Sequence, residues 1–365
     1  GRFATLVSQL NGWLTASDPL LTTAHPRQRR VLLASVVVIF AFTVFSHPLT
    51  PFFTIASVGA LVIFRRCTPF WLPILMAIMT GAWIIIMTQA FLVGHMYEVF
   101  GNFGQVNYAI TSNVAARVEG SPGHIFIGEM RVIMTAALWG LAFTGAVRRL
   151  RKGYRDVSYI LLAIAPFPLI VANSYDGEML LRIYLFSLPP MVFFAAALFY
   201  PTPLSGMSRK TTAAVAGVSL ILLGGFLFTR YGNERMDYMS NAEIDGMNYL
   251  YSIAQPKSLL IESSYSTPWE YQGFEKYNYY SLTTVLPEAV THKDIGSIVR
   301  FINSENSTDT YLIFARSEKA SAGLLLGLPP KTLDRLEVAL LKSGKFVLLY
   351  SNPDVQIIKY IIIRH

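Results

Sequence analysis

The chain has 365 residues, of which 53% are hydrophobic and only 14% charged, whereas soluble domains carry about 25% charged residues. This composition excludes an ordinary soluble domain and favours a protein embedded in lipid. The formal net charge is +8, but the basic residues separate apolar stretches instead of gathering on one polar face, so we expect no nucleic-acid partner. The single cysteine, Cys67, excludes an internal disulfide framework.

The first 30 residues are predicted to form an interfacial amphipathic helix and a cytoplasmic linker. Apolar side chains recur at helical spacing between residues 2 and 15, in a stripe too short to cross a bilayer. Pro19 marks the end of this helix, because proline cannot continue it. The chain begins with Gly rather than Met, which favours a sequence that starts partway through a longer protein.

Seven apolar stretches follow, and we interpret them as about seven transmembrane helices within a membrane domain of residues 31–229. They lie at about 31–47, 50–64, 69–93, 130–147, 157–172, 183–200 and 211–229. Two pairs of prolines are expected to interrupt the fifth and sixth stretches, namely Pro166, Pro168, Pro189 and Pro190. Such kinks either border a cavity or serve ordinary packing.

Basic residues occur in alternate connections between these stretches. Twelve of them precede the first, separate the second from the third, follow the fourth and precede the seventh: Arg27, Arg29, Arg30, Arg65, Arg66, Arg148, Arg149, Arg151, Lys152, Arg155, Arg209 and Lys210. Because cytoplasmic loops are rich in Lys and Arg, these connections are predicted to be cytoplasmic. Seven spans that start inside finish outside, so residues 230–365 are predicted to be extracytoplasmic.

The polar composition of residues 230–365 predicts a separate α/β domain. We expect a helix capped by Ser240 or Asn241, a strand over 258–262, and a helix capped by Thr291 that runs to about Phe301. A strand over 310–315, a helix over about 331–342 and a hairpin of 345–350 with 355–363 complete the order. This length is sufficient for a hydrophobic core of its own.

The predicted outer loop of residues 94–129 is too long for a passive connector, and loops of this length usually bind or cover something. It contains Glu98 and Arg117, and Arg131 follows it closely. We expect a re-entrant or surface helix near 105–118. Its histidines, His95 and His124, are expected to have a surface or hydrogen-bonding role rather than to bind a metal ion.

The predicted outer connection between the fifth and sixth stretches places Asp176, Glu178 and Arg182 at the membrane surface. Ionisable groups at this depth are candidates for function. A carboxylate can act as a base or hold a divalent cation that binds diphosphate, and the arginine can bind a lipid phosphate. The alternative is a structural ion pair, because Glu178 and Arg182 have i,i+4 spacing.

Aromatic residues are concentrated between residues 265 and 280, directly after the first predicted strand of the C-terminal domain. They include Trp269 and Tyr271. Aromatic faces beside carboxylates suit sugar rings, but they suit a membrane-interface belt or a seam between domains equally well. The segment is therefore a candidate substrate-binding surface with two structural alternatives.

Three segments carry a resemblance to a known class of enzymes. They are SYDGEMLLRIYLFSLPPMVFF at 174–194, PKSLLIESSYSTPWEYQGFEKYNYYSL at 256–282 and KSGKFVLLYSNPDVQIIKY at 342–360. Together they resemble polytopic envelope proteins of actinobacteria that look like GT-C glycosyltransferases. The resemblance implies a polyprenyl-phosphate-linked sugar donor, an envelope glycan acceptor and transfer on the outer face of the membrane.

The chain departs from this class at one position that matters. GT-C enzymes usually carry a catalytic acidic residue in their first outer loop, whereas residues 46–51 contain no acid. The resemblance therefore assigns no catalytic residue here, and the chain is either the C-terminal portion of such an enzyme or a non-catalytic relative. The alternative function is a membrane subunit whose outer domain binds partner proteins.

Overall fold

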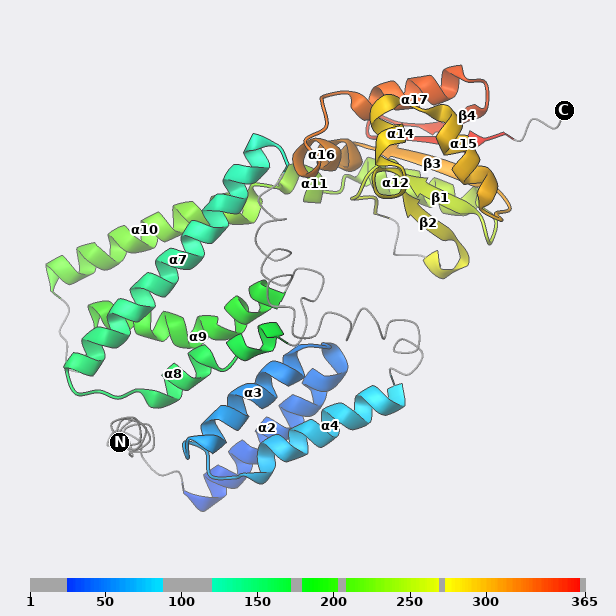
Figure 1. Ribbon diagram of the computed structural model, residues 1–365. Coiled ribbons are helices and arrows are strands. Elements are labelled where there is room, and N and C mark those ends of the chain that lie inside the picture. The colour runs from blue at the N-terminus through cyan, green and yellow to red at the C-terminus, as the bar shows by residue number, and fades with distance from the viewer. Residues whose placement is uncertain (1–24, 88–119, 172–178, 203–207, 269–272, 362–365) are drawn as a thin grey trace, which may run out of the picture. The chain divides into compact units, whose positions relative to one another are not determined.

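A computed structural model describes residues 25–87, 120–171, 179–202, 208–268 and 273–361 (Figure 1). The chain divides into two compact units. The helical unit comprises Gly1–Arg117 and Val132–Leu222, and the second unit comprises Val118–Arg131 and Leu223–His365. The boundaries at Arg131/Val132 and Leu222/Leu223 fall inside long helices, so one end of each of these helices belongs to the second unit.

Each of the seven predicted apolar stretches contains helical structure. The elements are α2 (Pro26–Ser46), α3 (Thr50–Ile63), α4 (Trp71–Met87), α7 (Pro122–Arg151), α8 (Val157–Ile164) with the 3-10 helix η2 (Phe167–Val171), α9 (Met179–Phe199) and α10 (Arg209–Tyr231). Four of them, α2, α7, α9 and α10, are long and apolar enough to cross a membrane. The chain is therefore a membrane protein, while the prediction of seven spans is not confirmed.

The surfaces of these helices carry many exposed apolar side chains. Ile39, Ile63 and Ile221 are 65%, 74% and 74% exposed, respectively. Apolar surface this extensive is not stable in water and is typical of helices that contact lipid.

The interruption expected at the prolines is confirmed for the fifth stretch, whereas the sixth remains helical through its two prolines. Helix α8 ends at Ile164, and the chain continues as η2 past Pro166 and Pro168. In contrast, Pro189 and Pro190 lie inside the continuous helix α9. Helix α7 also begins eight residues earlier than expected, at Pro122, so the end of the predicted outer loop is helical.

A buried ion pair stabilises the turn between α7 and α8. Arg149 binds both carboxylate oxygens of Asp156, at 2.5 and 2.7 Å, and also donates to the carbonyl oxygen of Pro201. Its guanidinium lies 4.2 Å from the centre of the Tyr154 ring. Arg149 therefore has a structural role in addition to the topology signal inferred for it.

The second unit contains a five-stranded sheet in the order β2-β1-β3-β5-β4. The strands are β1 (Leu259–Glu262), β2 (Asn278–Ser281), β3 (Thr310–Ala315), β4 (Phe346–Ser351) and β5 (Val355–Tyr360). Strands β2, β1 and β3 are parallel, and β5 pairs antiparallel with both β3 and β4. The predicted hairpin is thus confirmed.

Helices cover both faces of the sheet (Figure 1). The helices are α11 (Glu234–Asp237), α12 (Asn241–Ile253), α13 (Leu282–Val285), α14 (Pro287–His292), α15 (Ile295–Ser304), α16 (Arg316–Leu325) and α17 (Thr332–Lys342), with the 3-10 helix η3 (Phe274–Lys276). Leu312 and Phe314 point into the core beneath α15 and α17, whereas Tyr311 and Ile313 point into the core beneath α12. This alternation is the two-residue period of a strand that is buried on both faces.

Most predicted elements of this domain are confirmed, one helix cap was misplaced and several short elements were missed. Ser240 caps α12 through a reciprocal capping box with Glu243, as its residue type predicted. Thr291 is not a cap: it lies within α14, and Asp294 caps α15 by accepting from the Ser297 N–H. Strand β2, the 3-10 helix η3 and helices α11, α13, α14 and α16 were not predicted.

Candidate functional site

The helical unit brings Arg182 against His47, a residue 135 positions earlier in the chain. Arg182 lies in the first turn of α9, and His47 lies in the connection between α2 and α3. The Nη1 atom of Arg182 is 3.5 Å from the Nε2 atom of His47, and both side chains are half-buried. The connection 46–51 and the start of α9 therefore lie at the same end of this unit, as the alternation of basic residues predicts.

The hydrogen bonds of His47 determine which ring nitrogen carries the proton. Its Nδ1 atom accepts from the backbone N–H groups of Leu49 and Thr50, at 3.2 and 3.3 Å, at the start of α3. A neutral imidazole with an accepting Nδ1 carries its hydrogen on Nε2, and an arginine nitrogen can only donate. His47 and Arg182 thus both present N–H groups at this position, and an anionic oxygen can accept hydrogen bonds from both.

An apolar cluster adjoins this pair of donors. Met179, three residues before Arg182, and Ile183, directly after it, are buried together with Phe53 of α3. The Phe53 ring is stacked on Phe186 at 4.2 Å. A cationic group beside buried aromatic and aliphatic side chains suits an amphipathic ligand with an anionic head and an apolar tail.

A second polar cluster lies in the C-terminal domain, where the parallel strands β1 and β3 end. Glu318, at the start of α16, accepts from the backbone N–H and the hydroxyl of Ser263 and from the Thr267 hydroxyl. Glu262, the last residue of β1, accepts from the Thr267 N–H at 3.3 Å. Ligands of open α/β sheets usually bind at this edge, so the cluster is a candidate binding site by its position.

Burial, and to a lesser extent the negative charge of Glu262, raise the pKa of Glu318 to about 8. The hydroxyls of Ser263 and Thr267 oppose this increase. However, the Glu318 side chain has no exposed surface, so it cannot touch a substrate in this conformation. We interpret the cluster as an anchor for residues 263–268, the segment that leads to Trp269.

A neighbouring carboxylate, Glu243 of α12, anchors the start of the domain. It binds the Ser317 N–H at 2.8 Å and the Arg316 guanidinium at 3.0 Å. Burial alone would raise the pKa of Glu243, but hydrogen bonds from Ser240, Ser317 and Arg316 hold this pKa below its usual value. Arg316 also donates to the carbonyl oxygens of Arg235 and Tyr238, so it ties α16 to the chain that follows α10.

The predicted site residues have different outcomes. Six of them lie outside the described residues, and their placement stays a prediction: Asp176, Glu178, Glu98, Arg117, Trp269 and Tyr271. Arg131 lies in α7 and donates its Nε–H to the Thr229 carbonyl oxygen at 3.2 Å, within the second unit. Arg182 lies beside a second ionisable side chain, that of His47.

The hydrogen-bonding role expected for His124 is confirmed, because its Nδ1 atom lies 3.3 Å from Asn233 Oδ1 in a buried contact. His95 lies outside the described residues. Within the described ranges, no group of three or more His, Cys, Asp or Glu side chains is placed to hold a metal ion. The carboxylates predicted to hold a divalent cation, Asp176 and Glu178, fall outside these ranges.

Sequence reasoning missed His47 and Glu318. The connection 46–51 contains no acid, and nothing in its local pattern indicates that its histidine meets an arginine. Glu318 precedes a run of small residues without hydrophobic periodicity, so nothing in the local pattern indicated that it is buried.

Comparison with known proteins does not assign the chain to a family. No family model matches it, and a search of curated proteins found no significant match.

Proposed function

We propose that the protein takes part in glycosyl transfer to cell-envelope glycans, and that the end of its helical unit formed by His47 and Arg182 binds the phosphate of a polyprenyl-phosphate-linked sugar. The observation that carries this proposal is the convergence of two N–H donors at 3.5 Å beside an apolar cluster. The phosphate oxygens would accept from both donors. The polyprenyl chain would lie along the apolar helices.

The distribution of charge supports a phosphate at this end of the unit. His47 lies at the start of α3, where the backbone N–H groups carry a partial positive charge. The twelve basic residues of the alternate connections belong to the opposite end in the predicted topology. We therefore propose that the His47–Arg182 end faces the outside of the cell, with the C-terminal domain on the same side and about seven spans in total.

The proposal is tested by lipid binding to the purified protein in nanodiscs. Undecaprenyl phosphate is the probe, and native mass spectrometry measures its occupancy. Arg182→Ala is expected to weaken binding about tenfold or more, because a charge-assisted hydrogen bond contributes about 1.5–3 kcal/mol. His47→Ala is expected to weaken it as well, whereas His47→Asn can retain part of the helix-capping interaction.

Arg209→Ala is the matched control, because Arg209 is an exposed arginine at the start of another long apolar helix. This variant is expected to bind undecaprenyl phosphate as the unchanged protein does. Equal binding by Arg182→Ala and the unchanged protein would overturn the proposed site. A glycosylation assay in cells that depend on the full-length gene then distinguishes an enzyme from a subunit that only binds partner proteins: Arg182→Ala should abolish transfer in the first case alone.

A further inference from the structure

Two segments of the helical unit bring arginines together at one end of α2, α3 and α4. Helices α2 and α4 begin at this end and α3 finishes there (Figure 1). The Nη2 atom of Arg29 in α2 donates to the Thr68 hydroxyl, in the connection from α3 to α4, at 2.7 Å. We refer to this surface as the arginine end, and its exposed arginines are Arg27, Arg29, Arg30 and Arg65.

The described part of the helical unit supplies no negative charge to the arginine end. Among the described residues of this unit, Asp156 is the one acidic residue, and its carboxylate is bound to Arg149. The first five residues of α2 include three arginines and no acid, although the positive end of a helix dipole favours acidic residues. The surface is therefore strongly positive and attracts an anion from outside the chain.

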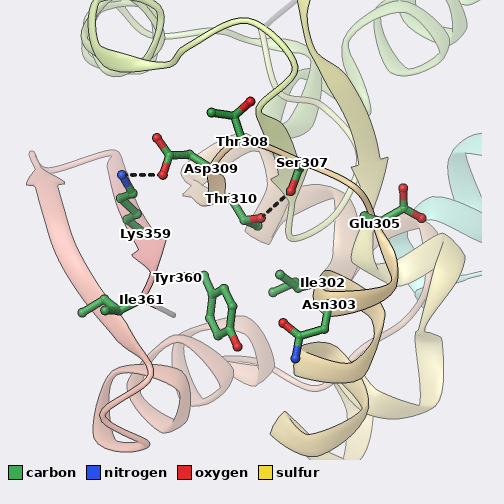
Figure 2. Close-up of a pocket in the computed structure, with 10 residues that line it drawn as sticks. All are labelled: Ile302, Asn303, Glu305, Ser307, Thr308, Asp309, Thr310, Lys359, Tyr360 and Ile361. Carbon is green, nitrogen blue, oxygen red and sulfur yellow. Dashed lines mark hydrogen bonds and ion pairs between the residues drawn. The ribbon is translucent and has the colours of Figure 1, made fainter. Parts of the chain in front are cut away.

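Basic residues of the C-terminal domain differ in this respect. Lys359 lies in the lining of a cleft, where it forms an ion pair with Asp309 at 2.7 Å (Figure 2). Lys319 is paired in the same way with Asp334, at 2.8 Å. In that domain the chain itself compensates these positive charges, whereas at the arginine end it does not.

The backbone of Arg65 has a conformation that favours glycine. Helix α3 ends in a Schellman motif, in which the Arg66 N–H donates to the Leu61 carbonyl at 2.7 Å and the Arg65 N–H donates to the Val62 carbonyl at 3.0 Å. Arg65 occupies the left-handed position of this motif, with φ +58°. The corresponding position after α7 is Gly153. An arginine is thus unfavourable for the backbone at position 65, which supports a role for its side chain.

Exposed apolar side chains adjoin the arginines and indicate their depth in the membrane. Ile63, Phe70 and Trp71 are 74%, 69% and 43% exposed. Helix α2 is long and apolar enough to cross a membrane, and its arginines precede the apolar part. This end therefore lies where acyl chains meet headgroups. Phospholipid phosphates lie at that level, and a guanidinium group can bind two phosphate oxygens.

We propose that the arginine end binds the phosphates of anionic phospholipids, with Phe70 and Trp71 against the acyl chains. A lipid with a net negative charge is favoured over a zwitterionic one, whose ammonium group compensates its phosphate. This inference goes beyond the proposed function and does not rest on it, because His47 lies at the opposite end of α2, where it meets Arg182.

The test measures which lipid contacts the arginine end of the whole chain. Cys67→Ser removes the single cysteine, and Ile63→Cys then carries a fluorophore. The protein is placed in nanodiscs of equal parts phosphatidylglycerol and phosphatidylcholine, one of which is brominated, because bromine quenches fluorescence only at close range. Ile221→Cys provides the reference position, since Ile221 on α10 is also 74% exposed.

Phosphatidylglycerol is expected to bind about tenfold more tightly than phosphatidylcholine at position 63, whereas the two lipids should quench equally at position 221. High salt should reduce the preference, because it screens the charges. Arg29→Gln and Arg65→Gln should each lower the preference about fivefold, since a basic residue near an anionic surface contributes about this factor. Arg65→Lys keeps the charge and should keep most of the preference.

Arg65→Gly separates lipid binding from stability, because it suits the backbone and removes the charge. It should lose lipid preference as Arg65→Gln does, while remaining at least as resistant to detergent unfolding as the unchanged protein. Arg151→Gln, at an exposed arginine near the end of α7, is the matched control and should not change quenching at position 63.

Equal quenching by the two lipids at position 63 would overturn the inference. So would a preference that the folded variants Arg29→Gln and Arg65→Gln retain in full. Displacement of phosphatidylglycerol by inorganic phosphate, but not by chloride at the same ionic strength, would indicate a soluble anion in place of a lipid and would also overturn it. Binding of undecaprenyl phosphate at His47 and Arg182 is measured separately, so either proposal can fail alone.

Discussion

Glu318 provides the sharpest test of the reasoning on the C-terminal domain. Its carboxyl is fully buried, and burial together with the negative charge of Glu262 raises its pKa to about 8, from a usual value of 4.5. The folded protein therefore keeps the proton up to about pH 8, whereas the unfolded chain loses it near pH 4.5. Because the folded state binds more protons in this window, stability falls as the pH rises.

The magnitude follows from the size of the pKa difference. One pKa unit corresponds to about 1.4 kcal/mol. The protonated Glu318 carboxyl contributes fully to the free energy of unfolding below pH 4.5, and this contribution decreases by roughly 5 kcal/mol by pH 8. Between pH 5 and pH 7.5 the expected decrease is roughly 3 kcal/mol. Glu318→Gln removes this titration. The amide oxygen of Gln can still accept from Ser263, and its NH₂ group can donate to the Thr267 hydroxyl.

Native-state hydrogen exchange of the protein in nanodiscs measures the effect. The amides of Leu260 and Leu312, in fully buried strand positions, report opening of the sheet. The difference in opening free energy between Glu318→Gln and the unchanged protein should shift by roughly 3 kcal/mol between pH 5 and pH 7.5, in favour of the Gln variant at the higher pH. The control Glu288→Gln, on a carboxylate of α14 whose side chain is 87% exposed, should show no such shift. A difference that is independent of pH would mean that Glu318 ionises normally and would refute the argument from burial.

Two further predictions concern local structure. Gly120 has φ +111°, and a Cβ atom there would lie 2.5 Å from the Leu324 carbonyl oxygen. Gly120→Ala should therefore lower the free energy of unfolding by on the order of 1–3 kcal/mol and increase hydrogen exchange in α16. Gly123→Ala, where a Cβ atom would have no neighbour nearer than 4.0 Å, is the control and should have neither effect. Asp156→Asn leaves Arg149 buried without its charged partner and should destabilise the helical unit by roughly 3–5 kcal/mol in detergent unfolding. Arg151→Ala, an exposed neighbour, is the control, and equal stability of the two variants would show that the ion pair contributes nothing.

Elements with strong local signals could be predicted from the sequence. Ser240 with Glu243 three residues later is a capping box, and it starts α12 where the pattern indicated. The turn at 351–354 joins β4 and β5 because Asn352 accepts from the backbone N–H groups of Asp354 and Val355. These interactions join residues within three positions of each other, so they are visible without the tertiary structure.

Elements stabilised by distant or polar contacts were not predictable in this way. Helix α16 buries Ser317, Glu318 and Ser321 and therefore lacks an apolar stripe. Strand β2 has four residues, of which Ser281 alone is buried, and its register comes from parallel pairing with β1. For α15, Thr291 and Asp294 are both acceptable caps by residue type, and the hydrogen bond to Ser297 decides between them.

The candidate lipid site illustrates the same limit. Arg182 was identified from its position at the edge of an apolar stretch, but its partner His47 is 135 residues away. The contact between them arises because α3 and α9 share the apolar cluster around Phe53 and Ile183. Hydrophobic packing thus determines which polar groups meet, and a sequence pattern indicates each group alone.

The two polar clusters also differ in the hydrogen-bonding groups that they bring together. Around Glu318, donors and acceptors are matched internally: hydroxyl and amide N–H groups meet a carboxyl group, and the result is a rigid loop. At His47 and Arg182, two donors face one another, because the Nδ1 atom of the histidine is already occupied as an acceptor by the start of α3. A cluster that is matched internally contributes stability by itself, whereas two N–H donors beside an apolar cluster can also bind an anionic oxygen. Substitution should therefore affect the two places differently: changes at Glu318 should appear in unfolding, and changes at Arg182 should appear in lipid binding.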